Sequence, residues 1–215
     1  VYREVEAYDT SLVLLEDKFD DRYFIPQGTN YVEAITQIIN DAGIWKISIP
    51  KLLGDLRTDK EFEIGTSRLH AVNELLKEIN YTSIWVDEWG YFTSNPYVLP
   101  TNRIAEYEYR NNQMSIIIPD TAIEEKDIFN TPNSWVITAS NPETEPLVSR
   151  YKNDNPSSKT STVSRKRTIT FEGFMNDILD QKTLDEYTQR IAYNSSSTYG
   201  KFVFDTAIMP HHSYM

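Results

Sequence analysis

Apolar residues recur every three or four positions in two stretches of the first hundred residues, and this spacing predicts two amphipathic helices. The first helix follows Asn30, which we expect to cap it together with Glu33 in a capping box, and it ends at Gly43. The second helix runs from about Ser67 to Asn80. Its apolar stripe consists of Leu69, Val72, Leu75, Leu76 and Ile79.

Alternating apolar and polar residues predict strands around these helices. Residues 2–19 alternate and then contain the apolar run from Leu12 to Leu15, which predicts two strands. A short strand is expected over 44–49. Residues 81–94 predict a β-hairpin, because Gly90 can adopt the positive φ that a short turn requires.

The second half of the chain is dominated by short strand-like segments separated by prolines. One helix interrupts them, and the capping box of Thr183 and Glu186 predicts its start. The predicted class is therefore α+β. We expect strands of an interrupted β domain over 1–25, a small α+β lobe over 26–102, and a β-rich domain with one helix over 103–215.

Composition excludes several kinds of chemistry. The 215 residues contain no cysteine, so thiolate catalysis and cysteine-ligated metals are ruled out. No glycine-rich phosphate loop or nucleophile elbow is present, and no catalytic residue, cofactor or metal site is predicted. His70 falls inside a predicted helix, and His211 and His212 lack the spacing of a metal site. No apolar run is long enough for a membrane helix, and no signal peptide is recognisable.

Charge gives one local contrast. The chain carries a formal net charge of −11, which opposes binding to a nucleic-acid backbone. However, six basic residues and one acid, Asp154, lie between Arg150 and Thr170. No aromatic residue lies between the last four cations, Lys159, Arg165, Lys166 and Arg167, whereas single-strand binders usually stack bases on aromatic rings. Contact with a neighbouring subunit is the favoured interpretation, and a solvated loop or a nucleic-acid contact remain alternatives. The proposed subunit-docking residues are Lys159, Arg165, Lys166 and Arg167.

The order of several segments resembles the hub proteins of phage and prophage tails. These segments are "YVEAITQIINDAG", "WVDEWGYFTSNPYVLP", "NTPNSWVITASNPETEPLVSRYKNDNPSSKTSTVSRKRTI", "TLDEYTQRIAY" and "FVFDTAIMPHH". The family comprises baseplate hubs related to late-control-D-like proteins and PBSX-type prophage hubs. The similarity spans about residues 26 to 212. This sequence departs from the family pattern at its ends, where the expected N-terminal barrel strands and a C-terminal spike or lytic module are not recognised.

The resemblance implies a homotrimer whose β-barrel-like, tube-forming domains build a ring that continues the tail tube. Its partners would be tail tube, distal tail or spike proteins in the virion, after assembly in the host cytoplasm. DNA would pass through the channel without specific binding, and no membrane contact is implied. An acidic channel wall would not hold phosphates, so Glu106 and Glu108 are candidate channel-lining residues.

Two other functions remain as alternatives to the structural hub. A carbohydrate- or receptor-binding tail module would use aromatic side chains as stacking platforms. The candidates for this role are Trp85, Trp89, Tyr91 and Trp135. A cell-wall hydrolase would need a pair of carboxylates, but the acidic pairs fall in predicted turns and polar loops, where solvated side chains are expected.

Overall fold

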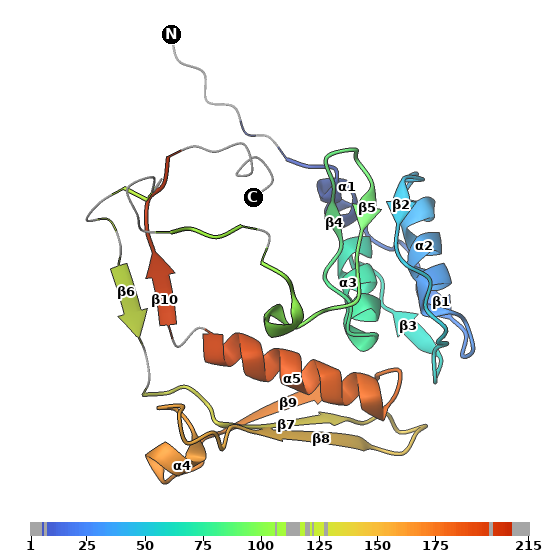
Figure 1. The fold of residues 1–215 in the computed structure, drawn as a ribbon. Helices are drawn as coiled ribbons and strands as arrows, with labels where there is room; N and C mark the ends of the chain where they lie inside the picture. The colour runs from blue at the N-terminus through green and yellow to red at the C-terminus, as the bar shows by residue number, and fades with distance from the viewer. Residues whose placement is uncertain are drawn as a thin grey trace. The chain divides into compact units, whose positions relative to one another are not determined.

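A computed structural model describes residues 6, 8–105, 107–110, 117–118, 121, 123–126, 129–197 and 200–207. The chain forms two compact units, each assembled from separate stretches of sequence (Figure 1). Unit 1 comprises residues 1–97, 138–148 and 174–186. Unit 2 comprises residues 98–137, 149–173 and 187–215. The three-part division proposed above remains a prediction.

Unit 1 is organised around two helices that pack against each other. Helix α2 (Tyr31–Asp41) and helix α3 (Arg68–Glu78) both form where the apolar spacing predicts them. Asn30 caps α2 by accepting a hydrogen bond from the Val32 amide, and Ser67 caps α3 by accepting one from the His70 amide. Gly43 follows α2 with a φ of 80°, a conformation that suits glycine. Both helices are therefore confirmed, together with the Asn30 cap and the terminating Gly43 of α2.

The N-terminal segment corrects one prediction. The apolar run Leu12 to Leu15 belongs to helix α1 (Ser11–Glu16), not to a strand. Leu14 is completely buried in the core of unit 1, while Val13 and Leu15 remain exposed. A short apolar run has no clear periodicity, so its contacts with α3 decide its conformation. Strands β1 (Tyr23–Ile25) and β3 (Lys60–Phe62) pair antiparallel beside these helices.

The predicted hairpin is confirmed within a three-stranded sheet of order β2-β5-β4. Strands β4 (Trp85–Val86) and β5 (Phe92–Thr93) pair antiparallel, and Gly90 has a φ of 79°. Strand β2 (Ile47–Ser48) pairs with β5 in parallel and is shorter than the strand predicted over 44–49. Phe92 points into the continuous hydrophobic core of unit 1, which extends from Leu14 to Phe92.

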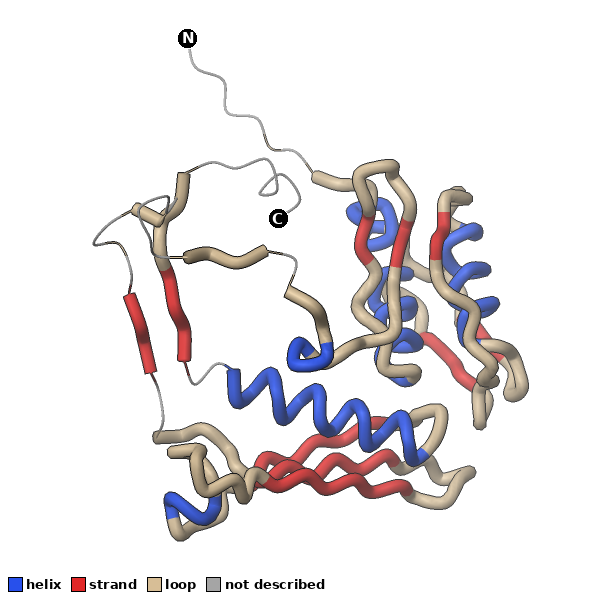
Figure 2. The backbone as a smooth tube through the Cα atoms, in the orientation of Figure 1, coloured by secondary structure: helices blue, strands red, loops and turns tan. Residues whose placement is uncertain are grey.

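A second three-stranded sheet has the order β8-β7-β9 (Figure 2). Its strands are β7 (Ser134–Ala139), β8 (Leu147–Lys152) and β9 (Thr170–Met175). The strand β8 was not predicted, because only three of its six residues are apolar. Alternate residues of β7 are buried, and the ring nitrogen of Trp135 donates to Ser195 Oγ at 2.8 Å.

That serine lies on helix α5 (Gln181–Ser197), which starts one turn before the predicted capping box. The amide of Thr183 donates to Asp180 Oδ1 at 2.7 Å, so Asp180 caps the helix. Thr183 itself is buried in the first turn. Asp180 follows the buried residues Asp177 and Ile178. Its side-chain oxygen can therefore accept from the first turn of the helix, as N-cap residues do.

The remaining elements are short. Strands β6 (Ile123–Lys126) and β10 (Gly200–Val203) pair antiparallel. Helix α4 (Thr162–Arg165) and the 3₁₀ helix η1 (Pro100–Asn102) interrupt loops of unit 2. The α+β class is confirmed. Across the described stretches, the strands form four open sheets of two or three strands, and none closes into a barrel. No helix found there combines the length and the apolar character needed to cross a membrane.

Candidate functional site

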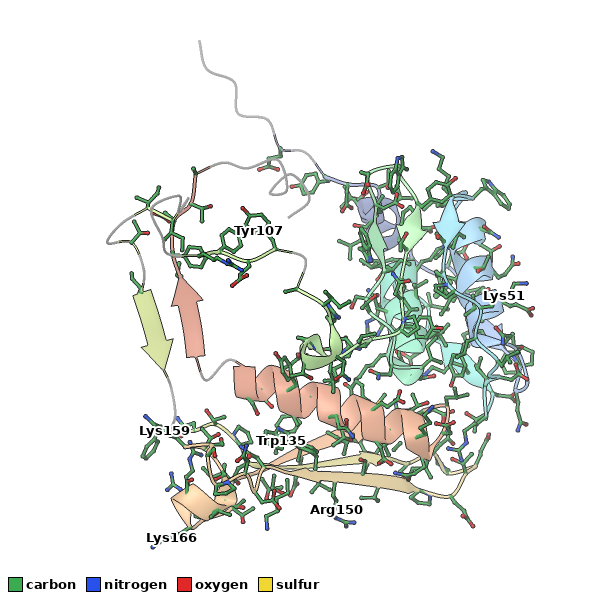
Figure 3. The ribbon with its side chains drawn as sticks, in the orientation of Figure 1. Lys51, Tyr107, Trp135, Arg150, Lys159 and Lys166 are labelled. Atoms are coloured by element: carbon green, nitrogen blue, oxygen red, sulfur yellow. The ribbon has the colours of Figure 1, made fainter. Side chains whose placement is uncertain are left out.

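The basic stretch folds into a loop that surrounds helix α4. Ser161 caps α4 by accepting a hydrogen bond from the Ser164 amide. Lys166 follows the helix with a φ of 51°, the left-handed conformation that ends it. Lys159, Lys166 and Arg167 are exposed, whereas Arg165 is partly buried. Figure 3 shows Lys159 and Lys166 at this end of unit 2 and Arg150 on β8.

The four predicted docking residues therefore differ in their surroundings. The Arg165 guanidinium donates from Nη1 to the Thr131 carbonyl at 2.6 Å, and its Nη2 atom is buried without a partner. Arg165 thus anchors the loop internally. Lys159, Lys166 and Arg167 form no ion pair with any other described residue. Their charges are free to meet a partner.

A buried asparagine holds the loop in place. Asn133 is fully buried, and its Nδ2 donates to the carbonyls of Thr160 and Arg167 at 3.1 and 3.0 Å. Its Oδ1 accepts from the Ile169 amide at 2.8 Å. One side chain thereby fixes both ends of the basic segment. This role was not predicted, because Asn133 lies in an ordinary turn-like segment before β7.

The structure also brings an aromatic ring to the loop from outside it. The Arg167 guanidinium lies 5.4 Å from the centroid of the Phe129 ring. The segment from Lys159 to Arg167 contains no aromatic residue, so this pair could not be predicted from the local sequence. The exposed Phe129 ring orients the Arg167 guanidinium through a cation–π contact. The guanidinium can still bind a carboxylate.

The two proposed channel acids cannot be treated together. Glu106 lies outside the described residues. Glu108 is exposed and accepts from Arg110 Nη2 at 2.5 Å, so its charge is balanced locally. The neighbouring Tyr107 and Tyr109 rings meet edge to face at 4.9 Å. A channel role for these acids remains a proposal.

The aromatic residues considered as sugar platforms separate into two groups. Trp135 is completely buried, so it cannot serve as a platform, and that part of the alternative is corrected. The register pairs Trp85 with Thr93 and Val86 with Phe92. Residues paired in this way project from the same face of a sheet. Since Phe92 faces the core, Trp85 and Tyr91 share the outer face of the sheet.

The turn beside this outer face is held in one conformation. Asp87 Oδ1 accepts from the amides of Trp89 and Tyr91 at 3.0 and 2.8 Å. Lys46 Nζ donates to the Trp89 carbonyl at 3.2 Å and lies 5.6 Å from the centroid of the Tyr91 ring. Trp89 is 68% exposed on this ordered turn. Exposed rings on a constrained turn are well suited to contacting a ligand or a partner.

A groove of about 740 Å³ runs beside α2 in unit 1. Its polar wall is one face of α2, formed by Glu33, Thr36, Gln37 and Asn40. Its apolar wall is formed by Trp45, Ile47, Ile49, Leu52 and Leu53. Trp45 is 76% exposed and Leu53 is completely exposed. Walls of opposite polarity suit an amphipathic ligand. This groove was missed, because it depends on packing between segments that a sequence pattern does not place.

A smaller pocket of about 360 Å³ lies in unit 2, and its lining contains no charged residue. Tyr151 and Tyr193 supply aromatic walls, and amides and hydroxyls supply most of the remainder. The side-chain amide of Asn153 is already used, since it donates to Ser158 Oγ at 3.1 Å. A neutral polar pocket offers no attraction for phosphate or for a metal cation.

A cluster of ionisable residues is buried in unit 1. Lys60 Nζ donates to Glu74 Oε1 at 2.6 Å and to Glu78 Oε1 at 2.5 Å. Burial raises the pKa of Glu78, although the Lys60 charge opposes this. Burial lowers the pKa of Lys60, but the carboxylates of Glu78 and Glu74 outweigh it and leave the pKa above its ordinary value. The Lys60 ammonium is therefore held charged at neutral pH.

Two further groups complete this cluster. Burial raises the pKa of Tyr31, and the charges of Glu78 and Asp177 raise it further, so the phenol stays protonated. Tyr31 Oη and Glu78 Oε2 are buried without a hydrogen-bond partner. Thr58 Oγ1 donates to Asp177 Oδ2 at 2.7 Å, and Asn141 Nδ2 donates to Thr58 Oγ1 at 3.1 Å. The cluster joins distant segments of unit 1, which favours a structural role.

The histidines and acids give no metal site in the described part. His70 is exposed on α3, as expected of a helix-surface residue, and its Nε2 lies 3.4 Å from Glu74 Oε2. His211 and His212 lie outside the described residues. No group of three or more His, Asp or Glu side chains suited to a metal ion occurs among the residues that the structure describes.

Comparison with solved structures identifies the fold. The chain superposes on the 43 kDa tail protein of prophage MuSo2 from Shewanella oneidensis with a TM-score of 0.57. The two sequences are 11% identical, and the match covers 94% of this chain and 58% of that protein. A tail protein from Neisseria meningitidis gives a TM-score of 0.59 at 11% identity, covering 91% of this chain and 56% of that protein.

The fold is therefore similar to that of phage and prophage tail proteins. This chain spans a little over half the length of each of these two proteins. No protein-family model matches the chain, and a search of curated proteins gives no match. The similarity lies in the arrangement of helices and strands.

Proposed function

We propose that this protein is a structural, non-enzymatic component of a bacteriophage or prophage tail. In this proposal it is a hub or baseplate protein whose trimeric ring continues the tail tube. The observation that carries the proposal is the fold similarity to two tail proteins over more than nine-tenths of the chain. The protein would act in the virion tail after assembly in the host cytoplasm, without a cofactor, and would contact tube, distal tail or spike proteins.

The open sheets fit a protein that completes its β structure on assembly. In the sheet β8-β7-β9, strands β8 and β9 lie at the edges and have unpaired outer backbone groups within the described residues. Unpaired edges are sites where further strands can add. Strands from flanking segments or from a neighbouring copy would turn such sheets into the barrel-like, tube-forming domains of the proposal.

The channel proposal concerns Glu106 and Glu108. A negative wall lets DNA slide, because it does not bind phosphates. Arg110 pairs with Glu108 and offsets part of its charge. The test is to replace both acids by lysine in a phage that carries this gene and to measure DNA delivery. Unchanged delivery would contradict the channel role.

The main test is the absolute mass in solution, measured by light scattering on a sizing column. The monomer has a mass of 25.0 kDa, and a hub gives a particle of three times that mass. Electron microscopy of the same sample shows whether the particle is a closed ring. A monomer at every protein concentration would contradict ring formation by this chain.

The second candidate function is carbohydrate or receptor binding. The observation that favours it is the exposed aromatic surface of Trp85, Trp89 and Tyr91, together with the groove in which Trp45 faces a polar helix. Sugar rings have apolar faces and polar edges, and such walls complement both. A glycan-binding screen of the wild-type protein and of Trp45→Ala and Trp89→Ala variants tests it. An absence of binding by the wild type excludes this function for the glycans screened.

A further inference from the structure

The charges of this protein are divided between its two units. Unit 1 contains 23 acidic and 10 basic residues, a net charge of −13. Unit 2 contains 9 acidic and 11 basic residues, a net charge of +2. The overall charge of −11 therefore conceals a bipolar molecule. Such a molecule attracts other copies of itself most strongly when unlike units meet.

Most of the positive charge of unit 2 lies between Arg150 and Arg167, on β8 and in the loop around α4. The basic surface consists of five exposed residues: Arg150, Lys152, Lys159, Lys166 and Arg167. None of them forms an ion pair with another described residue, and only one acid, Asp154, lies among them in the sequence. The hydrogen bonds of Asn133 and Arg165 hold the loop that carries three of them. Because the loop is already ordered, docking would cost little conformational entropy.

Unit 1 carries a complementary surface. The acidic end consists of Asp55, Asp59, Glu143, Glu145 and Asp180, all of which are exposed and outside every described ion pair. The hydrogen bond from Asn141 to Thr58 holds the loop of Glu143 beside the segment of Asp59. The Leu179 side chain packs on Gly54, where an added Cβ would approach Leu179 Cδ1 to 2.9 Å. These contacts gather acids from three distant segments.

We infer that the basic surface of one copy docks on the acidic end of unit 1 of a second copy. The contact is heterologous, since it joins different surfaces of the two copies. Repetition of such a contact generates a closed ring when the rotation permits. The inference rests on the proposed hub function and identifies the contact that would build its ring. A nucleic acid is the poorer occupant, because unit 1 repels phosphate.

Charge exchange tests this pairing directly. The double variant Lys159→Glu/Lys166→Glu reverses part of the basic surface, and Glu143→Lys/Glu145→Lys reverses part of the acidic end. Each double variant alone places like charges opposite each other and is expected to shift the mass from the trimer to the monomer of 25.0 kDa at low salt. The quadruple variant restores opposite charges at the contact and is expected to recover the trimer.

A matched control separates the contact from net charge. The variant Lys18→Glu/Lys51→Glu changes the net charge as much as the basic variant does, at exposed lysines outside both surfaces. It is expected to remain a trimer, and circular dichroism checks that every variant is folded. A wild-type trimer that the two surface variants leave intact would overturn the docking but keep the hub. A wild-type monomer at all concentrations and salt levels would overturn both.

Discussion

The two units bury different kinds of polar groups. Unit 1 buries the carboxylates Glu78 and Asp177, which accept hydrogen bonds from Lys60, Thr58 and the Ile178 amide, and Glu78 Oε2 has no partner among the described residues. The polar residues known to be buried in unit 2 are all neutral, and Asn133 is the most extensively bonded of them. Because these charges are buried, the stability of unit 1 depends on pH and on the side chains that pair with Glu78 and Asp177. Neutral hydrogen bonds make unit 2 depend on packing and on the shape of its loops.

The first prediction tests whether unit 2 can be destabilised separately from unit 1 by a change in its core. Trp135→Ala removes a completely buried ring and its hydrogen bond to Ser195. We expect a loss of about 3–5 kcal/mol in the free energy of unfolding, because the surrounding side chains cannot fill so large a cavity. Hydrogen exchange should show loss of protection in β7, while α2 and α3 keep theirs. Equal loss in α2 and α3 would show that the units unfold together.

The second prediction breaks the buried ion pair of unit 1. Lys60→Met leaves the Glu78 carboxylate buried without its cation, which should cost about 3 kcal/mol. The double variant Lys60→Met/Glu78→Gln removes the stranded charge and should recover part of that loss. Denaturant unfolding of the three proteins measures both effects. If the double variant were as unstable as Lys60→Met, the stranded charge would not be the cause.

The third prediction concerns the loop of unit 2. Asn133→Ala leaves the carbonyls of Thr160 and Arg167 and the amide of Ile169 without their partner. We expect a loss of about 2 kcal/mol, since buried polar groups become unsatisfied. Protection of the Ile169 amide from hydrogen exchange should fall most. Asn155→Ala in the exposed part of the same loop is the control and should have little effect.

The last prediction has the smallest expected effect and concerns the pH dependence of the stability of unit 1. Burial raises the pKa of Glu78 above its ordinary value of 4.5, so the folded state favours the protonated acid. The stability that results is fully present below pH 4.5 and is lost as the pH rises through the raised value. The wild type should therefore gain stability relative to Glu78→Gln as the pH falls from 7 towards 4.5. Unfolding curves at several pH values measure this slope, and a flat difference would contradict the shift.

Local signals were sufficient where one segment contains all that it needs. Helices α2 and α3 were predicted because each carries a cap and an apolar stripe in consecutive residues. The hairpin of β4 and β5 was predicted because Gly90 sits at its turn. The basic loop was also recognised from sequence, including its turn-forming residues and its exposed Lys159 and Lys166.

Other features required contacts between distant residues. The run from Leu12 to Leu15 became a helix because it packs on α3, and a short apolar run suits either conformation. Trp135 was a candidate platform by its residue type, yet the ring is buried and bonded to Ser195. Arg165 looked equivalent to its neighbours until its guanidinium met the Thr131 carbonyl.

The sequence by itself determined helices α2 and α3, α5 to within one turn, the hairpin, the absence of thiol chemistry and the position of the positive charge. The tertiary structure decided which cations are free, which aromatic residues are exposed, and which acids form the acidic end of unit 1. The physical reason is that periodicity and caps act within a few residues, whereas burial and charge pairing depend on segments folded together. Glu78 illustrates this, since only the approach of Lys60 makes a carboxylate on the buried face of α3 tolerable.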